Sequence, residues 1–239
     1  MHLHADWERR AGDSLTDRRD VLLGCGAVLD HCATALAATG WIPRVRRFPH
    51  GDHDSHLAIL EVVDGPPRES AVELAAAIPR RRADRRPFTA SLSPGSLELL
   101  HIRAARMQVE LAVVPRVRWT RLGDGGVVLR YGAGAAPDAN VDDAVMLVLA
   151  TSRDDDSMRL RAGEALSRVV LTAAAMGLAS CPLTEPLNDN RSRLALACEV
   201  FDGESHPQAL IRLGVPAPGA DLPPPLPRRT VSETTTWHV

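Results

Sequence analysis

The sequence predicts an α+β fold in which a mixed sheet is packed by helices. Two short stretches, Ala144–Ala150 and Ala209–Val215, are continuously apolar, as is typical of strands buried on both faces. Longer segments place their apolar residues at helical spacing, which indicates helices that cover such a sheet. No motif recurs at a fixed period, so the 239 residues do not form a repeat array.

The longest predicted helix covers residues 17–40. Asp17 can cap its first turn, and Gly40 can end it. Its apolar residues recur at helical spacing and are Val21, Leu22, Cys25, Val28, Leu29, Cys32 and Leu36. Further helices are expected at residues 68–79, 94–107, 156–178 and 189–201.

Three more strands are expected, at residues 44–48, 56–63 and 109–114, and a polar loop joins the first two. Between residues 115 and 142 the sequence is rich in glycine and weakly patterned. The tail after Pro216 is rich in proline, and we expect it to be extended.

The composition excludes several classes of function. The net charge is -2 and aromatic residues make up 3% of the chain, which disfavours nucleic-acid binding. No apolar run approaches the length needed to span a bilayer, and the N-terminus lacks the basic-then-apolar order of a signal peptide. The four cysteines form no Cys-x-x-Cys pair. We expect them to be reduced thiols that act as small buried hydrophobic residues. We therefore expect a cytoplasmic protein without nucleic-acid or membrane partners.

All 28 basic residues are arginine, because the chain contains no lysine. Phosphate binding by a Walker-A lysine is therefore excluded. Covalent attachment of pyridoxal phosphate is excluded for the same reason, since the Schiff base requires a lysine amine.

Arginine is concentrated in two places. Five of the seven residues from Arg80 to Arg86 are arginine, and Arg228-Arg229 follows a proline run near the C-terminus. A guanidinium is a planar fork that binds phosphate or carboxylate through two parallel hydrogen bonds. The two clusters could converge on one phosphate. The alternatives are a solvated helix end with a solvated tail, or a nucleic-acid patch, which the net charge disfavours.

The histidine-rich stretch His50-Gly51-Asp52-His53-Asp54-Ser55-His56 raises a metal hypothesis. Three imidazoles and two carboxylates offer enough ligands. Their spacing matches no closed zinc site, however, and alternate side chains of an extended loop point apart. We therefore expect a polar hairpin loop and no metal.

The predicted helix at 156–178 is rich in small residues from Gly163 onward. Small residues allow either the close approach of a second helix or a flat ligand against the backbone. The sequence leaves both possibilities open, with a packed central helix as the commoner outcome.

Three ordered motifs together resemble nitroreductase-family flavoproteins. Residues 163–187 resemble that family's core helix and the loop after it. Pro-Gln-Ala-Leu-Ile-Arg-Leu-Gly at 207–214, followed by Pro-Arg-Arg at 227–229, resembles its last strand and arginine tail. Arg-Arg-Ala-Asp-Arg-Arg-Pro-Phe at 81–88 resembles its Arg-Arg-Ser/Thr-x-Arg motif.

One branch of the family, the Acg-type NAD(P)H nitroreductases, accounts for the N-terminal part as well. Its Gly-Cys-Gly-Ala-Val-Leu-Asp-His segment is mirrored at 24–31, and Leu-Ala-Ala-Thr-Gly-Trp follows at 36–41. The resemblance covers nearly the whole chain except about 105–140. It implies a nitroreductase-like fold.

The resemblance also implies an FMN-dependent oxidoreductase. NADH or NADPH would deliver hydride to FMN, and the flavin would pass it to a nitroaromatic or quinone-like acceptor. Arginines would hold the flavin phosphate, and backbone groups after the core helix would lie along the isoalloxazine edge. The implied cofactor-binding residues are Arg81, Arg82, Arg85, Pro182, Leu183, Thr184, Glu185, Arg228 and Arg229. No catalytic acid or base and no metal is implied.

The chain departs from the family pattern in three ways. Ala83 stands where the family has Ser or Thr, and the region between Phe88 and Val145 is short. The Pro-Ser-x-His-Asn-x-Gln-Pro-Trp segment of Acg-type proteins has no counterpart, so we expect an N-terminally truncated member.

Acg-type chains resemble a fused version of the nitroreductase dimer, and here the first half is expected to be incomplete. Residues 1–66 would be its remnant, and residues 67–239 the second half with the arginine tail, within one structural unit. A second copy of the chain could complete the site in a homodimer. The alternative function is a flavin-binding or flavin-sequestering protein, or a degenerate non-catalytic paralogue.

Overall fold

The computed structural model describes residues 1–9, 15–51, 55–90, 92–131 and 142–237. Its helices are α1 (Leu15–Ala38), α2 (Glu69–Ala77), α3 (Pro94–Ala105), α4 (Asp156–Ala175), α5 (Asn190–Phe201) and α6 (Val231–Thr234). Short 3-10 turns are η1 (Trp7–Arg9), η2 (Arg116–Arg118) and η3 (Glu185–Leu187). Its strands are β1 (His2–His4), β2 (Trp41–Arg47), β3 (His56–Asp64), β4 (Glu110–Val113), β5 (Trp119–Arg121), β6 (Val127–Leu129), β7 (Val145–Thr151), β8 (Ala179–Leu183) and β9 (His206–Gly214).

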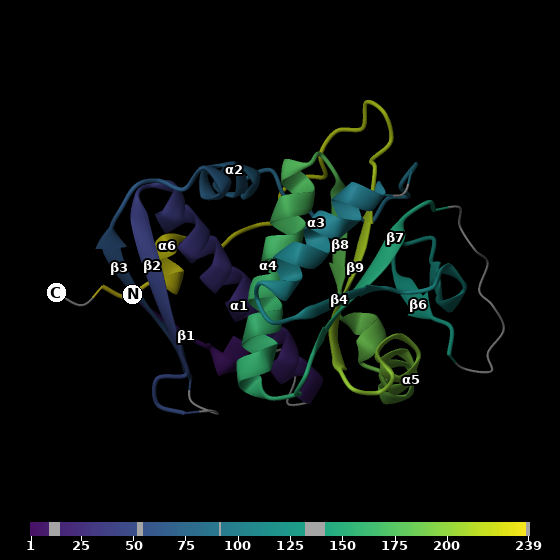
Figure 1. The fold of residues 1–239 in the computed structure, drawn as a ribbon, viewed down its shortest axis with the longest axis horizontal. Coiled ribbons are helices and arrows are strands. Elements are labelled where there is room, and N and C mark those ends of the chain that lie inside the picture. Colours follow the sequence, from purple (N-terminus) through teal and green to yellow (C-terminus); the bar gives the residue numbers. More distant parts are fainter. Residues whose placement is uncertain (10–14, 52–54, 91, 132–141, 238–239) are drawn as a thin grey trace.

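The larger sheet has the strand order β4-β7-β9-β8, and its neighbouring strands are antiparallel (Figure 1). Helices α3 and α4 pack on one face, against Leu147 and Leu149 of β7. Helix α5 and the β5-β6 hairpin cover the other face, against Met146 and Val148. Because successive side chains of β7 enter opposite cores, the prediction of a strand buried on both faces is confirmed.

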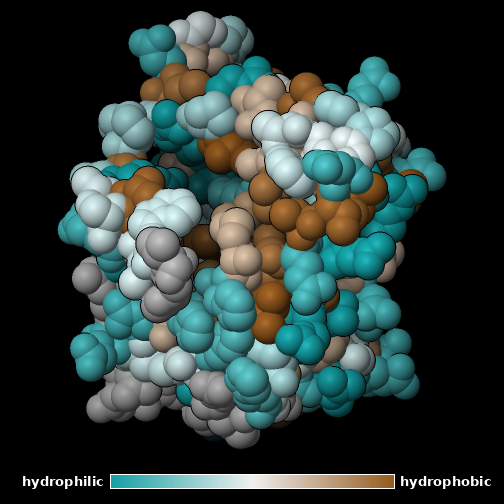
Figure 2. Space-filling view, turned by 90° about the vertical axis from the view of Figure 1, so that its left-hand side faces the viewer, coloured by the Kyte–Doolittle hydropathy of each residue, from teal (hydrophilic) through white to brown (hydrophobic). Residues whose placement is uncertain are grey.

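A second, three-stranded sheet has the order β1-β3-β2 and lies at the other end of the molecule (Figure 1). Helix α1 packs on it through Leu22 and Leu29, which meet Leu57 and Leu60 of β3. Figure 2 views the molecule from this end, where hydrophobic residues gather beside a hollow. Trp41, Val62 and Val63 are exposed hydrophobic residues of these strands.

The two ends of the molecule are joined where α1 crosses α4. A Cβ atom built on Gly26 of α1 would lie 2.1 Å from the carbonyl oxygen of Leu160. One built on Gly163 of α4 would lie 2.2 Å from the carbonyl oxygen of Leu23. Only glycine fits at such a backbone-to-backbone contact. The small residues of the central helix therefore serve the close approach of a second helix.

Helix α1 corrects one expectation from the sequence. Residues Asp17–Ala38 are long and apolar enough to cross a membrane by length and composition alone. The same helix carries the buried Asp30, whose carboxylate accepts hydrogen bonds from Ser167 and Arg168 of α4. An ion pair with the neighbouring helix is typical of a core helix, so this apolar run is explained by packing within the protein.

Five short elements of the described chain, β1, β5, β6, β8 and α6, were not predicted, and α6 is a helical turn within the tail that was expected to be extended. Strand β8 includes Pro182, which cannot donate a ladder hydrogen bond, and such a residue is tolerated because β8 is the last strand of its sheet. Strands β5 and β6 lie in the glycine-rich region 115–142, of which residues 132–141 fall outside the described part of the chain. Their three-residue length gives too few positions for an alternating pattern.

The other helices and strands, apart from the short 3-10 turns, begin and end within a few residues of their predicted positions. The isolated bridge between Ala83 and Ser180 is parallel, whereas the paired strands of the larger sheet are antiparallel. All four cysteines are free thiols. Cys181 is buried as expected, Cys25 and Cys32 are half-buried, and Cys198 is exposed, so the expectation is wrong for Cys198.

The helix crossing yields a prediction about stability. Gly26→Ala forces a methyl group into the backbone of α4, and overpacking of this kind costs about 1–3 kcal/mol. Gly24→Ala on the same helix meets nothing within 4 Å and should be neutral or stabilising by up to about 1 kcal/mol. Urea unfolding of both variants measures the difference. Equal stabilities of the two variants would contradict the close crossing.

Candidate functional site

The arginine-rich segment follows α2 and runs along the outer edge of β8. The backbone N–H of Asp84 donates to the carbonyl oxygen of Ser180 at 2.8 Å, beside the Ala83–Ser180 bridge. Through this contact the segment becomes an added edge of the larger sheet, which fixes where its side chains can point.

A buried arginine of β9, Arg212, holds the same segment through its backbone. Arg212 of β9 donates from Nη2 to the carbonyl oxygens of Asp84 and Arg86, each at 2.8 Å. Its Nη1 pairs with Asp142, and both side chains are fully buried. Asp142 also accepts a hydrogen bond from the backbone N–H of Phe88 at 3.0 Å, and the Arg212 guanidinium lies 4.2 Å from the centre of the Phe88 ring.

The sequence analysis missed Arg212 as a site residue. The available signal was a charged residue in the middle of the apolar strand Ala209–Val215, since buried charges require partners. A second arginine, Arg121 of β5, donates to the carbonyl oxygen of Arg85 at 2.7 Å and 3.0 Å, and it too was not anticipated.

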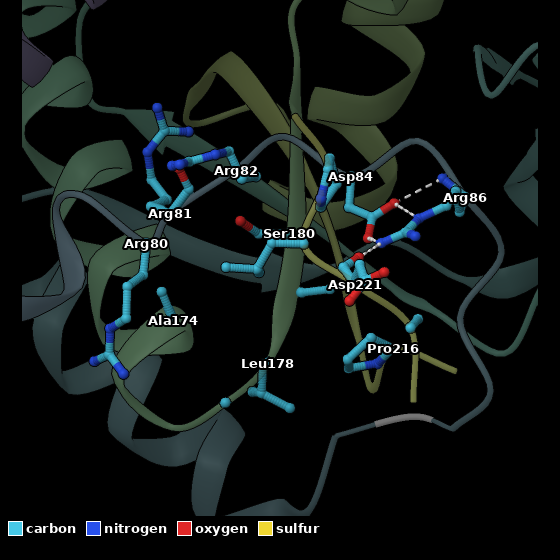
Figure 3. Close-up of a pocket in the computed structure, with 15 residues that line it drawn as sticks. Arg80, Arg81, Arg82, Asp84, Arg86, Ala174, Leu178, Ser180, Pro216 and Asp221 are labelled. Atoms are coloured by element: carbon cyan, nitrogen blue, oxygen red, sulfur yellow. Dashed lines mark hydrogen bonds and ion pairs between the residues drawn. The ribbon is translucent and has the colours of Figure 1, made fainter. Parts of the chain in front are cut away.

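The arginine side chains of the segment divide into paired and unpaired groups. Figure 3 shows Arg86 turned back onto Asp84, with Nε and Nη2 donating to its carboxylate at 3.0 Å and 2.8 Å. Burial opposes ionisation of Asp84, but the hydrogen bonds and charge of Arg86, with the charge of Arg212, hold its pKa below the usual value. Arg80 donates to the carbonyl oxygen of Ala76 and points away from Arg81 and Arg82 (Figure 3).

Two cavities flank the segment. The smaller, of about 220 Å³, lies between the segment, the end of α4 and β8, and is the one drawn in Figure 3. The larger, of about 940 Å³, lies between the segment, α1 and the C-terminal tail. Its lining includes Arg81, Arg82, Ala83, Arg85, Arg86, His31 and Arg228. The tail therefore brings Arg228 to the same cavity as the first arginine cluster.

The charges at this larger cavity are unbalanced, because five arginines but one carboxylate, Asp221, stand among its described lining residues. Within the described part of the chain, no carboxylate forms an ion pair with Arg81, Arg82 or Arg228. Burial and the positive charges of Arg228 and Arg82 lower the pKa of Arg81. Burial and the charges of Arg81 and Arg228 lower the pKa of His31 to about 4, so this imidazole is neutral at physiological pH. Positive charge that lacks a counter-ion favours the binding of an anion.

The predicted residues after the core helix lie at the end of β8 and the start of η3, outside the lining of the larger cavity. Leu183 is buried, and the Thr184 hydroxyl donates to Asp20 of α1 at 3.2 Å. Glu185 accepts from Arg85 at 3.3 Å, so Arg85 connects this stretch to the cavity. Arg229 is exposed and is not part of the lining. The roles assigned to these residues stay predictions.

Comparison with known proteins places the chain in a class. No family model matches it. A solved structure, a provisionally named nitroreductase from Desulfovibrio desulfuricans in complex with FMN, matches with a TM-score of 0.51 and 20% identity, over 69% of this chain and 96% of that one. The fold is therefore that of the nitroreductases.

Relatives found by sequence define the family more narrowly than the structural match does. A Mycobacterium tuberculosis protein with the provisional name NAD(P)H nitroreductase is 38% identical over 97% of this chain and 81% of its own length. Acg from the same organism, which has the same provisional name, is 32% identical over 92% of this chain and 81% of its own length. The chain belongs to this family of Acg-type nitroreductases, as its motifs predicted.

The alignment with the first of these relatives is 280 residues long, whereas this chain has 239. The chain is therefore internally shorter than the relative.

The buried ion pair beneath the arginine segment gives a second prediction. Asp142→Ala leaves Arg212 charged, buried and unpaired, and loss of one partner of a buried pair costs about 3–5 kcal/mol. Asp143→Ala removes the neighbouring, exposed carboxylate and should change stability by less than about 0.5 kcal/mol. Denaturant unfolding of both variants tests this. A small effect of Asp142→Ala would mean that the pair does not hold the segment.

Proposed function

We propose that this protein is an FMN-dependent oxidoreductase of the nitroreductase type. It would take hydride from NADH or NADPH and reduce a nitroaromatic or quinone-like acceptor. The observation that carries this proposal is the convergence of Arg81, Arg82 and Arg228 on one cavity, where no ion pair with a carboxylate of the described residues balances them. Membership of the nitroreductase family makes the FMN phosphate the anion that best explains the convergence.

The residues present fit FMN at its phosphate end. The larger cavity, of about 940 Å³, is at the upper end of the roughly 300–1,000 Å³ typical of sites for small ligands and cofactors. The Nε atom of Arg82 is buried without a hydrogen-bond partner, which leaves a donor for an incoming oxygen. A phosphate would satisfy this donor and relieve the repulsion between Arg81 and Arg228.

The chain's own residues would bind and orient the cofactor, and FMN would supply the hydride chemistry. Arg81, Arg82 and Arg228 would hold the phosphate. His31, being neutral, would line the cavity without adding charge. Arg85, through its pair with Glu185, would connect the phosphate end to the stretch Pro182–Glu185, along which the isoalloxazine edge is proposed to lie. No side chain is assigned as a catalytic acid or base.

We also propose the domain division and assembly expected from the family. Residues 1–66 hold the three-stranded sheet and α1, and residues 67–239 hold the larger sheet and the arginine tail. The exposed hydrophobic side chains at the three-stranded end (Figure 2) would suit contact with a second copy, and a homodimer would complete the site. The proposed location is the cytoplasm, where reduced nicotinamides are available.

The test of this proposal is the visible absorption spectrum of the purified chain after addition of FMN and desalting. A retained, shifted flavin band that NADH or NADPH bleaches is the expected result. Reoxidation of the bleached flavin by a nitroaromatic or a quinone would identify the acceptor class. Absence of retained flavin would contradict the proposal.

The phosphate role gives a third prediction. Arg228→Ala should weaken FMN binding by about ten- to a hundredfold, because a hydrogen bond to a charged group contributes about 1.5–3 kcal/mol. Riboflavin, which lacks the phosphate, should bind both proteins equally. Arg80→Ala is the matched control, since Arg80 belongs to the same segment but lies outside the larger cavity. Titrations followed by flavin fluorescence measure both ligands, and equal losses for FMN and riboflavin would count against the assignment.

A second candidate function is flavin binding without useful turnover, in a store or a degenerate paralogue. Ala83 favours it, because this residue lines the larger cavity where the family pattern has a hydroxyl. Loss of that donor removes a contact to the phosphate and weakens the hold on the cofactor. Flavin that is retained but not bleached by NADH or NADPH would identify this function.

Ala83 leads to a fourth prediction, a gain rather than a loss. Ala83→Ser adds a hydroxyl to the wall of the cavity and should tighten FMN by about tenfold or more. Riboflavin affinity should stay the same, which separates a phosphate contact from a change in packing. Tightening of both ligands, or of neither, would show that position 83 does not face the phosphate.

A further inference from the structure

Four histidines gather at one end of the three-stranded sheet. His2 and His4 alternate along β1 and so lie on one face of the sheet. His4 is the register partner of His56, the first residue of β3. The rings of His4 and His56 are 4.4 Å apart and nearly parallel, those of His2 and His56 are 4.9 Å apart, and His50 approaches His56 at 5.2 Å.

The separations between the ring nitrogens fit a single ion. The ligand atoms of His2, His4 and His56 all lie within 4.8 Å of one another, and His2 Nδ1 is 3.0 Å from His56 Nε2. In a tetrahedral zinc site the ligand nitrogens are roughly 3.4 Å apart, given Zn–N distances of about 2.0–2.1 Å. Small side-chain rotations of the two exposed rings would bring the three nitrogens to that spacing.

The three histidines differ in burial, and this difference suits a metal site that an ion can enter from solvent. His56 is buried, so its ring is fixed by the surrounding protein. His2 and His4 are exposed, and they leave a path by which an ion can enter. Two histidines at alternate positions of one strand, with a third directly across the ladder, present three imidazole nitrogen ligands from a rigid sheet.

The sequence pointed to a different set of ligands. His50, His53 and His56 with Asp52 and Asp54 were considered and set aside, and His53, Asp52 and Asp54 fall outside the described residues. Only the pairing of β1 with β3 brings His2 and His4 to His56 across 52 or more residues of chain.

We propose that His2, His4 and His56 form a binding site for a divalent transition-metal ion, best represented by Zn²⁺. Imidazole ligands suit zinc, copper and nickel rather than magnesium or calcium. A water molecule or His50 would take the fourth position. The site is separate from the arginine cavity, since no residue of one lines the other. The ion would also clamp the three-residue strand β1 to β3.

The test is Zn²⁺ titration by calorimetry of the full chain without an oligohistidine tag. One equivalent should bind with micromolar affinity or tighter. His4→Gln should lose at least about tenfold, and because His4 is exposed this variant should fold normally. His101→Gln is the matched control, since His101 lies on α3 and its Nδ1 contacts the carbonyl oxygen of Leu97. It should bind Zn²⁺ as the unaltered protein does.

Two further measurements test the same three-histidine site. Co²⁺ should give the visible absorption bands of a tetrahedral complex, and these should disappear in His4→Gln. Zn²⁺ should raise the melting temperature of the unaltered protein more than that of His4→Gln. Millimolar binding only, or binding that His2→Gln and His4→Gln leave unchanged, would overturn the site.

Discussion

Arg212 and Asp142 form an ion pair without access to solvent, and the geometry of the arginine cavity rests on it. Burying two charges is costly, and the cost is offset only when the remaining donors and acceptors are also satisfied. Here Nη2 of Arg212 donates to the carbonyl oxygens of Asp84 and Arg86, and Asp142 accepts from the backbone N–H of Phe88. Among the described residues only Nε of Arg212 has no hydrogen-bond partner within this pair. The segment is thereby fixed at three backbone positions, although most of its side chains are at the surface.

A fixed backbone lets the segment present several like charges together. In a free loop, repulsion would spread Arg81 and Arg82 apart, and solvent would weaken their joint effect. Held against β8, they share a cavity with Arg228, and burial together with these like charges lowers the pKa values of Arg81 and His31. The charges of Asp84 and Arg86 cancel within their ion pair. The unpaired positive charge of the segment therefore remains on the side that faces α1 and the tail.

Helix α1 connects the two possible functions of the molecule. Its crossing with α4, which Gly26 and Gly163 make possible, places His31 at the arginine cavity. Its other face supports the three-stranded sheet, where His2, His4 and His56 meet. A flavin site and a metal site would thus lie on separate parts of one framework, and each can be tested without the other.

The sequence by itself determined the family, the main helices and the buried strands, because motifs and apolar periodicity are local properties of the chain. It also pointed to Arg81, Arg82 and Arg228, since clustered arginines are visible without a structure. Tertiary structure alone decided that these residues share a cavity, that Arg212 supports them, and that His56 meets His2 and His4. Those contacts join residues more than 50 positions apart, and only strand pairing and helix packing, which no local pattern records, bring such residues together.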